Sequence, residues 1–173
     1  MKIAPGYVAV LREATARPDQ EDRLGKLVHG LRRQGARAKY VTSVCTGAFI
    51  LGVAGLLKGR RATTHWAYTG LLPMVGATYE KARVVRDGNV FTGGGVTAGI
   101  DFALTVAAEL AGAEAAQRIQ LSIEYDPAPP FTAGHPDHAP APVREAMTER
   151  FGTRLATFRG ELQQALAGGP RHM

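Results

Sequence analysis

A strand and the helix that follows it meet within one stretch of this 173-residue chain, Tyr40-Val41-Thr42-Ser43-Val44-Cys45-Thr46-Gly47-Ala48-Phe49-Ile50-Leu51. The β-branched run that ends at Cys45 predicts a strand over 38–44, and the apolar run after it predicts a helix. The small residues Ser43 and Gly47 flank the cysteine at two positions on either side. This spacing is typical of a strand-to-helix elbow, where a sharp turn leaves no room for larger neighbours.

Cys45 is the only cysteine in the sequence, and the elbow pattern makes it a candidate nucleophile. At such a turn the sulfur faces the first N–H groups of the helix, which favour the thiolate over the thiol. The alternative is a buried, inert cysteine, which is common for a lone cysteine. A single cysteine also excludes an intrachain disulfide and a multi-cysteine zinc site.

Strands and helices alternate along the rest of the chain. The Asp87-Gly88 pair between two β-branched runs predicts a hairpin over 79–92 with a type I′ turn. Alternation of this kind favours an α/β sheet covered on both faces. The other expected elements are short strands at 7–11 and 60–64, and helices at 18–35, 46–57, 97–110, 113–124 and 143–167.

Bulk properties limit the class of protein. A length of 173 residues with 45% hydrophobic content suits one folded domain. The sequence holds no run of 18 apolar residues, and Pro5, Arg12 and Glu13 interrupt the region where a signal peptide needs apolar residues. We therefore expect a cytoplasmic protein without a membrane span. The net charge is +6, but the basic residues are dispersed without interleaved aromatics, so direct nucleic-acid binding is not expected.

Three ordered blocks resemble the DJ-1/PfpI superfamily: residues 43–48 (SVCTGA), 54–66 (AGLLKGRRATTHW) and 92–101 (TGGGVTAGID). Residues 117–121 (QRIQL) and 124–131 (EYDPAPPF) are similar to its isocyanide (isonitrile) hydratase branch. The resemblance covers about residues 36–140. It implies a flavodoxin-like fold of the class I glutamine amidotransferase type, with a mostly parallel sheet and helices on both faces.

The resemblance also implies a domain plan. Residues 1–142 would form the DJ-1/PfpI-like domain, and residues 143–173 a C-terminal helix and tail. The family's first strand-helix-strand unit, with its carboxylate near the cysteine and its Gly-rich loop, is not recognisable before residue 20. The elbow strand should then have an uncovered edge. A second copy of the chain would cover this edge, so a homodimer is expected.

The implied activity is hydration of an isocyanide to an N-substituted formamide by a lyase without a cofactor. By this resemblance Cys45 attacks the terminal carbon, and water then displaces the sulfur from a thioimidate. Thr46 would hydrogen-bond the intermediate or a water. The alternative for Thr46 is a hydrogen bond within its own helical turn. The substrate would be a small molecule.

The resemblance places five residues around the substrate pocket. His65 lines the wall or caps local structure, with a direct catalytic role as the alternative. The peptidase-like branch has histidine directly after the nucleophile, where this chain has Thr46, so peptidase activity is not expected. Asp101 should make a structural hydrogen bond, and residues 135–138 (HPDH) lack the further ligands that a metal site needs. The expected pocket residues are Gly47, His65, Trp66, Gly94 and Gly95.

The sequence leaves two other functions open, ligand sensing and redox sensing. Some transcription regulators carry a similar domain that senses a ligand without catalysis, followed by a helix-turn-helix. After residue 131 the chain has too little sequence left for that DNA-binding half. The other function is redox sensing, in which Cys45 is oxidised to a sulfenic or sulfinic acid. All three functions need an accessible thiol, so the reactivity of Cys45 alone does not separate them.

Overall fold

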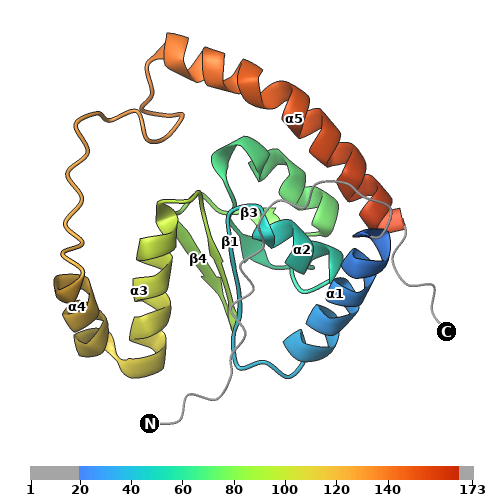
Figure 1. The fold of residues 1–173 in the computed structure, drawn as a ribbon, viewed down its shortest axis with the longest axis horizontal. Helices are drawn as coiled ribbons and strands as arrows, with labels where there is room; N and C mark the ends of the chain where they lie inside the picture. The colour runs from blue at the N-terminus through green and yellow to red at the C-terminus, as the bar shows by residue number, and fades with distance from the viewer. Residues whose placement is uncertain (1–19, 168–173) are drawn as a thin grey trace.

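The computed structural model describes residues 20–167 and shows an α/β arrangement around a three-stranded sheet (Figure 1). The strand order is β1-β5-β4, with β1 at Val41–Val44, β5 at Val90–Gly93 and β4 at Val84–Asp87. β1 and β5 are parallel, whereas β4 and β5 form an antiparallel hairpin. A second, two-stranded parallel sheet joins β2 (Arg61–Ala62) and β3 (Thr78–Tyr79).

Helices lie on both sides of the main sheet (Figure 1). On one side, α3 (Ala98–Ala111) packs on the strands and α4 (Ala113–Ser122) packs outside α3. On the other side lie α2 (Gly47–Val53), the 3-10 helix η1 (Trp66–Val75) and α1 (Gln20–Gly35). The long helix α5 (Ala141–Ala167) arches over η1 and α2. The predicted α/β fold class, with mostly parallel pairing and helices on both faces, is confirmed.

The core lies between α2, η1 and β1, and α5 closes it from outside. Phe49 of α2 is 2% exposed, and its ring packs against Tyr68 and Phe158. Leu162 of α5 is buried in the same cluster, so the C-terminal helix contributes to the core. A glycine is needed where α2 meets η1, because a Cβ at Gly52 would stand 2.5 Å from the Val75 Cβ.

The helix after Cys45 is shorter than the sequence predicts. It ends at Val53, and the expected continuation to Leu57 forms turns instead. Gly55 adopts a left-handed φ of +78°, and the N–H of Leu56 donates to the carbonyl of Leu51 over 2.9 Å. Gly55 lies just past the C-cap, and a left-handed glycine at this position commonly ends a helix. The helix therefore does not end at Lys58-Gly59, where the sequence predicts its end.

The hairpin predicted over 79–92 is confirmed, with its strands at Val84–Asp87 and Val90–Gly93, but its turn differs from the prediction. Asp87 pairs with Val90, so the two loop residues are Gly88 and Asn89. Gly88 has a φ of +61°, whereas Asn89 is not among the positive-φ residues. A positive φ at the first central position alone indicates a type II′ turn instead of a type I′ turn. Asp87 accepts a hydrogen bond from the N–H of Arg61 at 2.8 Å.

Some expectations fall on residues that the structure does not describe. The strand predicted at 7–11 and the helix start at 18–19 lie outside the described residues 20–167. Within that range, none of the helices is both long enough and apolar enough to span a bilayer.

Candidate functional site

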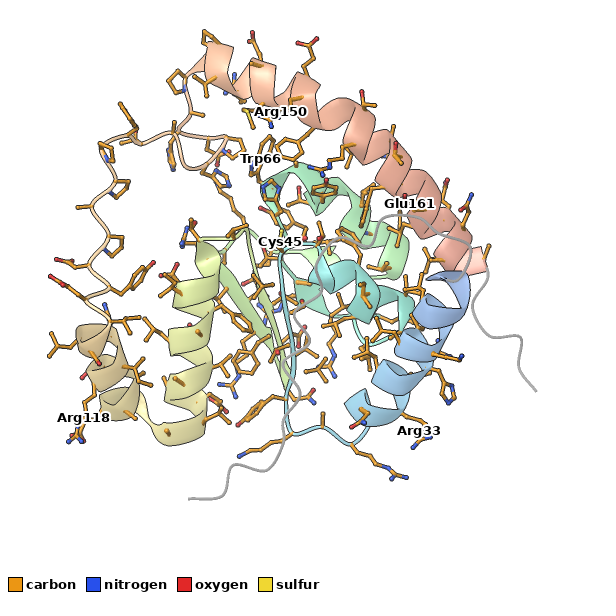
Figure 2. The ribbon with its side chains drawn as sticks, in the orientation of Figure 1. Arg33, Cys45, Trp66, Arg118, Arg150 and Glu161 are labelled. Atoms are coloured by element: carbon orange, nitrogen blue, oxygen red, sulfur yellow. The ribbon has the colours of Figure 1, made fainter. Side chains whose placement is uncertain are left out.

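Cys45 occupies the sharp turn between β1 and α2, as the sequence predicts (Figure 2). Its φ of +59° is left-handed, which is unusual for a residue with a side chain. Thr46 follows at the N-cap, and α2 begins at Gly47. As a residue, Cys45 is partly buried. The strand-to-helix elbow is therefore a strained backbone feature, with the candidate nucleophile at its apex.

Hydrogen bonds hold both sides of the Cys45 residue. Its N–H donates to the carbonyls of Gly93 at 2.9 Å and Gly94 at 2.8 Å, both at the end of β5. Its carbonyl accepts a hydrogen bond from the Thr64 hydroxyl at 2.8 Å. Because β1 and β5 are parallel, their carboxyl ends meet at one edge of the sheet. The three sequence blocks that resemble the family therefore converge on the backbone of Cys45.

Gly94 is the residue that the other segments surround. Its N–H donates to the carbonyl of Arg83 over 2.9 Å, while its own carbonyl accepts from Cys45. A Cβ at Gly94 would lie 3.6 Å from both the Ala98 Cβ and the Arg83 carbonyl oxygen, and 3.8 Å from the Thr64 carbonyl oxygen. Gly94, which the sequence predicts as a residue of the pocket wall, thus lies where four segments of the chain meet.

His65 lies beside Gly95 and caps the start of η1. A Cβ at Gly95 would stand 3.2 Å from the His65 Cδ2 atom. His65 Nδ1 accepts a hydrogen bond from the N–H of Ala67 at 3.2 Å. Burial lowers the pKa of His65, which favours the neutral ring. A neutral ring whose Nδ1 accepts carries its proton on Nε2, so His65 is a donor on the edge near Gly95.

Trp66 points toward α5 and the proline-rich loop. Its ring centroid lies 5.4 Å from that of Phe151 and 5.6 Å from that of His65. Trp66 also lines a pocket of about 140 Å³ together with residues of the 133–139 loop and of α5. Cys45 does not line that pocket. Trp66 therefore contacts His65, which lies at the site, and the pocket that Trp66 lines does not include Cys45.

Thr46 and Gly47 occupy the first positions after the nucleophile. The Thr46 side chain makes no capping hydrogen bond, so the local alternative for its hydroxyl is not observed. A Cβ at Gly47 would lie 3.6 Å from the Ser43 Cβ, which shows that the two small flanking residues face each other. Ser43 is 4% exposed, and its hydroxyl has no hydrogen-bond partner among the described residues.

Two further expectations concern residues away from the elbow. Asp101 makes structural bonds, as predicted: it pairs with Arg83 and accepts from the Tyr125 hydroxyl at 3.1 Å. His135 accepts a hydrogen bond from the N–H of Asp137 at 3.2 Å. Within residues 20–167 no group of three or more His, Cys, Asp or Glu side chains is arranged to hold a metal ion.

The sequence profile of the DJ-1/PfpI family matches residues 15–109, more than half of the chain. This chain belongs to the DJ-1/PfpI family. It is 63% identical over 125 residues to an isonitrile hydratase of Pseudomonas putida, an alignment that covers 72% of this chain and 55% of the hydratase. A crystal structure of a THiJ/PfpI family protein from Pseudomonas syringae matches with a TM-score of 0.75 and 49% identity, over 82% of this chain and 57% of that one.

A more distant relative has a different described role. The HTH-type transcriptional regulator GlxA of Rhizobium meliloti is 33% identical over 131 residues, which is 71% of this chain and 36% of the regulator. The chain thus spans little more than half the length of the hydratase and of the Pseudomonas syringae protein, and about a third of the regulator. The DJ-1/PfpI resemblance seen in the sequence is confirmed.

The lowered pKa of His65 predicts how stability depends on pH. An unfolded histidine binds a proton near pH 6.5, whereas His65 in the folded chain binds it only at a lower pH. The stabilising contribution is therefore complete above about pH 6.5 and is lost as the pH falls through the folded pKa. Urea unfolding of the wild type should show stability falling as the pH drops below about 6.5.

The His65→Asn variant tests this assignment, since asparagine keeps a capping acceptor and does not titrate. The variant should lose less stability than the wild type over the same pH range. Burial also lowers the pKa of His135, so the His135→Asn variant should reduce the pH dependence as well, and the two effects should add in the double variant. An unchanged pH dependence in His65→Asn would contradict the assignment.

Proposed function

We propose that this chain is an isonitrile hydratase-like enzyme that uses Cys45 to hydrate an isocyanide to an N-substituted formamide. The observation that carries the proposal is the 63% identity to the Pseudomonas putida isonitrile hydratase. The left-handed Cys45 at the junction of β1, β5 and α2 supports it, because a cysteine at such an elbow presents its sulfur to a substrate. The reaction makes the enzyme a lyase of small molecules.

The proposed chemistry balances with water as the only co-reactant. The Cys45 sulfur bonds to the terminal carbon of R–N≡C, and the thiol proton ends on the same carbon, which gives the thioimidate R–N=CH–S–Cys. A water oxygen then adds to that carbon and the C–S bond breaks. One water proton ends on nitrogen and the other on sulfur, so the products are R–NH–CHO and the free thiol. Thiolate sulfur is a strong nucleophile suited to the first step.

The surrounding residues have distinct proposed roles. Thr46 directly follows Cys45, so its hydroxyl and N–H are close to the nucleophile along the chain. The Thr46 hydroxyl makes no capping hydrogen bond and is therefore available to bond the intermediate. Gly47, Gly94 and Gly95 leave the space around the turn free of side chains, and a Cβ at Gly95 would stand 3.2 Å from the His65 Cδ2 atom. His65 offers an Nε2–H donor on the same side as Gly95. None of the hydrogen bonds to Cys45 from the described residues comes from a carboxylate.

Ligand sensing without turnover is the second candidate. It is supported by the 33% identity to the GlxA regulator and by 35% identity over 103 residues to the HTH-type transcriptional regulator CdhR of Pseudomonas aeruginosa. Both alignments cover about a third of the regulator. A sensing domain would bind the ligand through the same pocket, so turnover is the property that separates the two candidates.

Formamide production from a simple alkyl isocyanide tests the enzyme proposal. The wild type should produce formamide, and Cys45→Ala should abolish turnover because no other described residue at the elbow offers a comparable nucleophile. Thr46→Val should lower kcat by about 10- to 100-fold if its hydroxyl stabilises the intermediate. Thr46→Ser keeps the hydroxyl and should retain most of the activity.

Three results would count against hydration by Cys45. Turnover by the Cys45→Ala variant would remove the nucleophile from the mechanism. Full activity of Thr46→Val would remove the proposed hydroxyl contact. Binding of the isocyanide by the wild type without formamide production would favour the sensing function instead.

We also propose that the chain acts as a homodimer. Among the described residues, β1 pairs only with β5, so its other edge has no strand partner. Several large apolar side chains just before α3, on α3 and α4, and in the segment after α4 are also exposed, and such surface is typical of a subunit interface. They are Val96 (83% exposed), Leu110 (60%), Leu121 (84%), Ile123 (54%) and Phe131 (78%).

Sedimentation equilibrium tests the homodimer. The expected mass is twice the 18.4 kDa of the chain, and the Leu121→Glu variant should shift the equilibrium toward monomer by placing a charge in the interface. A wild-type chain that sediments as a monomer at all concentrations while it unfolds cooperatively would contradict the proposal.

A further inference from the structure

The peptide group that joins Gly93 to Gly94, called the Gly94 peptide below, is the structural support of Cys45. Its carbonyl, that of Gly93, accepts from the Cys45 N–H at 2.9 Å, and its N–H, that of Gly94, donates to the Arg83 carbonyl at 2.9 Å. Because the peptide group is planar, the backbone position of Arg83 sets where the Gly93 carbonyl lies, and that carbonyl in turn helps to hold the left-handed Cys45. Any force that fixes Arg83 acts on the nucleophile through a single peptide group.

The Arg83 side chain is fixed by α3. Its guanidinium pairs with the carboxylate of Asp101, in the first turn of that helix. The other oxygen of the same carboxylate accepts from the Tyr125 hydroxyl at 3.1 Å. Asp101 is well placed near the positive end of the helix, where a carboxylate is favoured. The residue just before β4 is thus tied to the first turn of α3, the helix that follows the Gly93–Thr97 turn.

We propose that Arg83 and Asp101 are positioning residues for the nucleophile. They act through the Gly94 peptide and hold Cys45 in its left-handed conformation, without touching the substrate. The expected effect on turnover rests on the proposed hydratase function. The expected effect on the reactivity of the Cys45 thiol does not, because that reactivity is measured without a substrate. Their loss should therefore change how fast the thiol reacts, even with a reagent unrelated to the substrate.

The structure contains a matched control pair. Arg86 of β4 pairs with Glu109 of α3, and Glu109 also accepts from a tyrosine hydroxyl, that of Tyr40 at 2.8 Å. The arginines are 57% and 51% exposed, and the carboxylates 32% and 26%. Both pairs thus join α3 to β4 or to the residue just before it, with the same chemistry. Only the Arg83–Asp101 pair lies at the Gly94 end of the hairpin, while the Arg86–Glu109 pair lies near its turn.

The experiment compares the second-order rate of Cys45 alkylation by iodoacetamide at fixed pH. Arg83→Gln and Asp101→Asn should each slow alkylation by roughly threefold to tenfold, less than the ~100-fold cost of displacing a reacting group by about 1 Å. Arg86→Gln and Glu109→Gln should leave the rate within about twofold of the wild type. Arg83→Lys, which keeps the charge, should recover part of the lost rate.

Thermal unfolding and hydratase kinetics complete the test. Surface ion pairs contribute little to stability, so all five single variants should remain folded and comparably stable. Where formamide turnover is measurable, the Arg83 and Asp101 variants should lower kcat with little change in KM. If the chain has no hydratase activity, the alkylation comparison still decides the positioning role.

Two outcomes would overturn the inference. In the first, the Arg86 and Glu109 variants slow alkylation as much as the Arg83 and Asp101 variants, which would mean that general docking of α3 is what matters. In the second, Arg83→Gln and Asp101→Asn leave the rate unchanged or raise it, which would mean that the Gly94 peptide holds Cys45 without help from the pair.

Discussion

The left-handed conformation of Cys45 is the constraint on which the rest of the site depends. A residue with a side chain is disfavoured at a φ of +59° by about 1–2 kcal/mol, so the surrounding structure must hold it there. The holding groups are the carbonyls of Gly93 and Gly94, which bind the Cys45 N–H, and the Thr64 hydroxyl, which binds its carbonyl. The strain places the sulfur at the apex of the turn, between the end of β1 and the start of α2.

The parallel pairing of β1 with β5 makes this support possible. Because the carboxyl ends of parallel strands meet at one edge, the turn after β5 lies against the turn after β1. The segment after β2 then adds Thr64 and His65 on the same side. Sites at the carboxyl ends of parallel strands recur in α/β proteins. In this member of the DJ-1/PfpI family, that edge holds the proposed nucleophile and its backbone donors and acceptors.

The sequence predicts the features that depend on neighbouring residues. The elbow follows from the small flanks of Cys45, and the hairpin and α3 follow from local patterns. The end of α2 at Val53 differs from the prediction because Gly55, before Lys58-Gly59, already adopts a left-handed φ. The turn type differs because Asp87 pairs with Val90, which makes Gly88 the first loop residue instead of the second. Contacts between distant segments leave no local signal. Examples are the Arg83 carbonyl on Gly94, and Phe151 of α5, whose ring centroid lies 5.3 Å from that of His65.

The strained, left-handed conformation of Cys45 is tested most directly by comparing the stabilities of Cys45→Gly and Cys45→Ala in urea. Both variants lack the thiol, but glycine adopts a left-handed φ without the Cβ penalty that alanine carries. If the elbow holds residue 45 at a φ of +59°, the glycine variant should be the more stable by about 1 kcal/mol. At an ordinary right-handed or extended position the order would reverse, since glycine loses more conformational freedom on folding. An alanine variant as stable as the glycine variant, or more stable, would contradict the strained elbow.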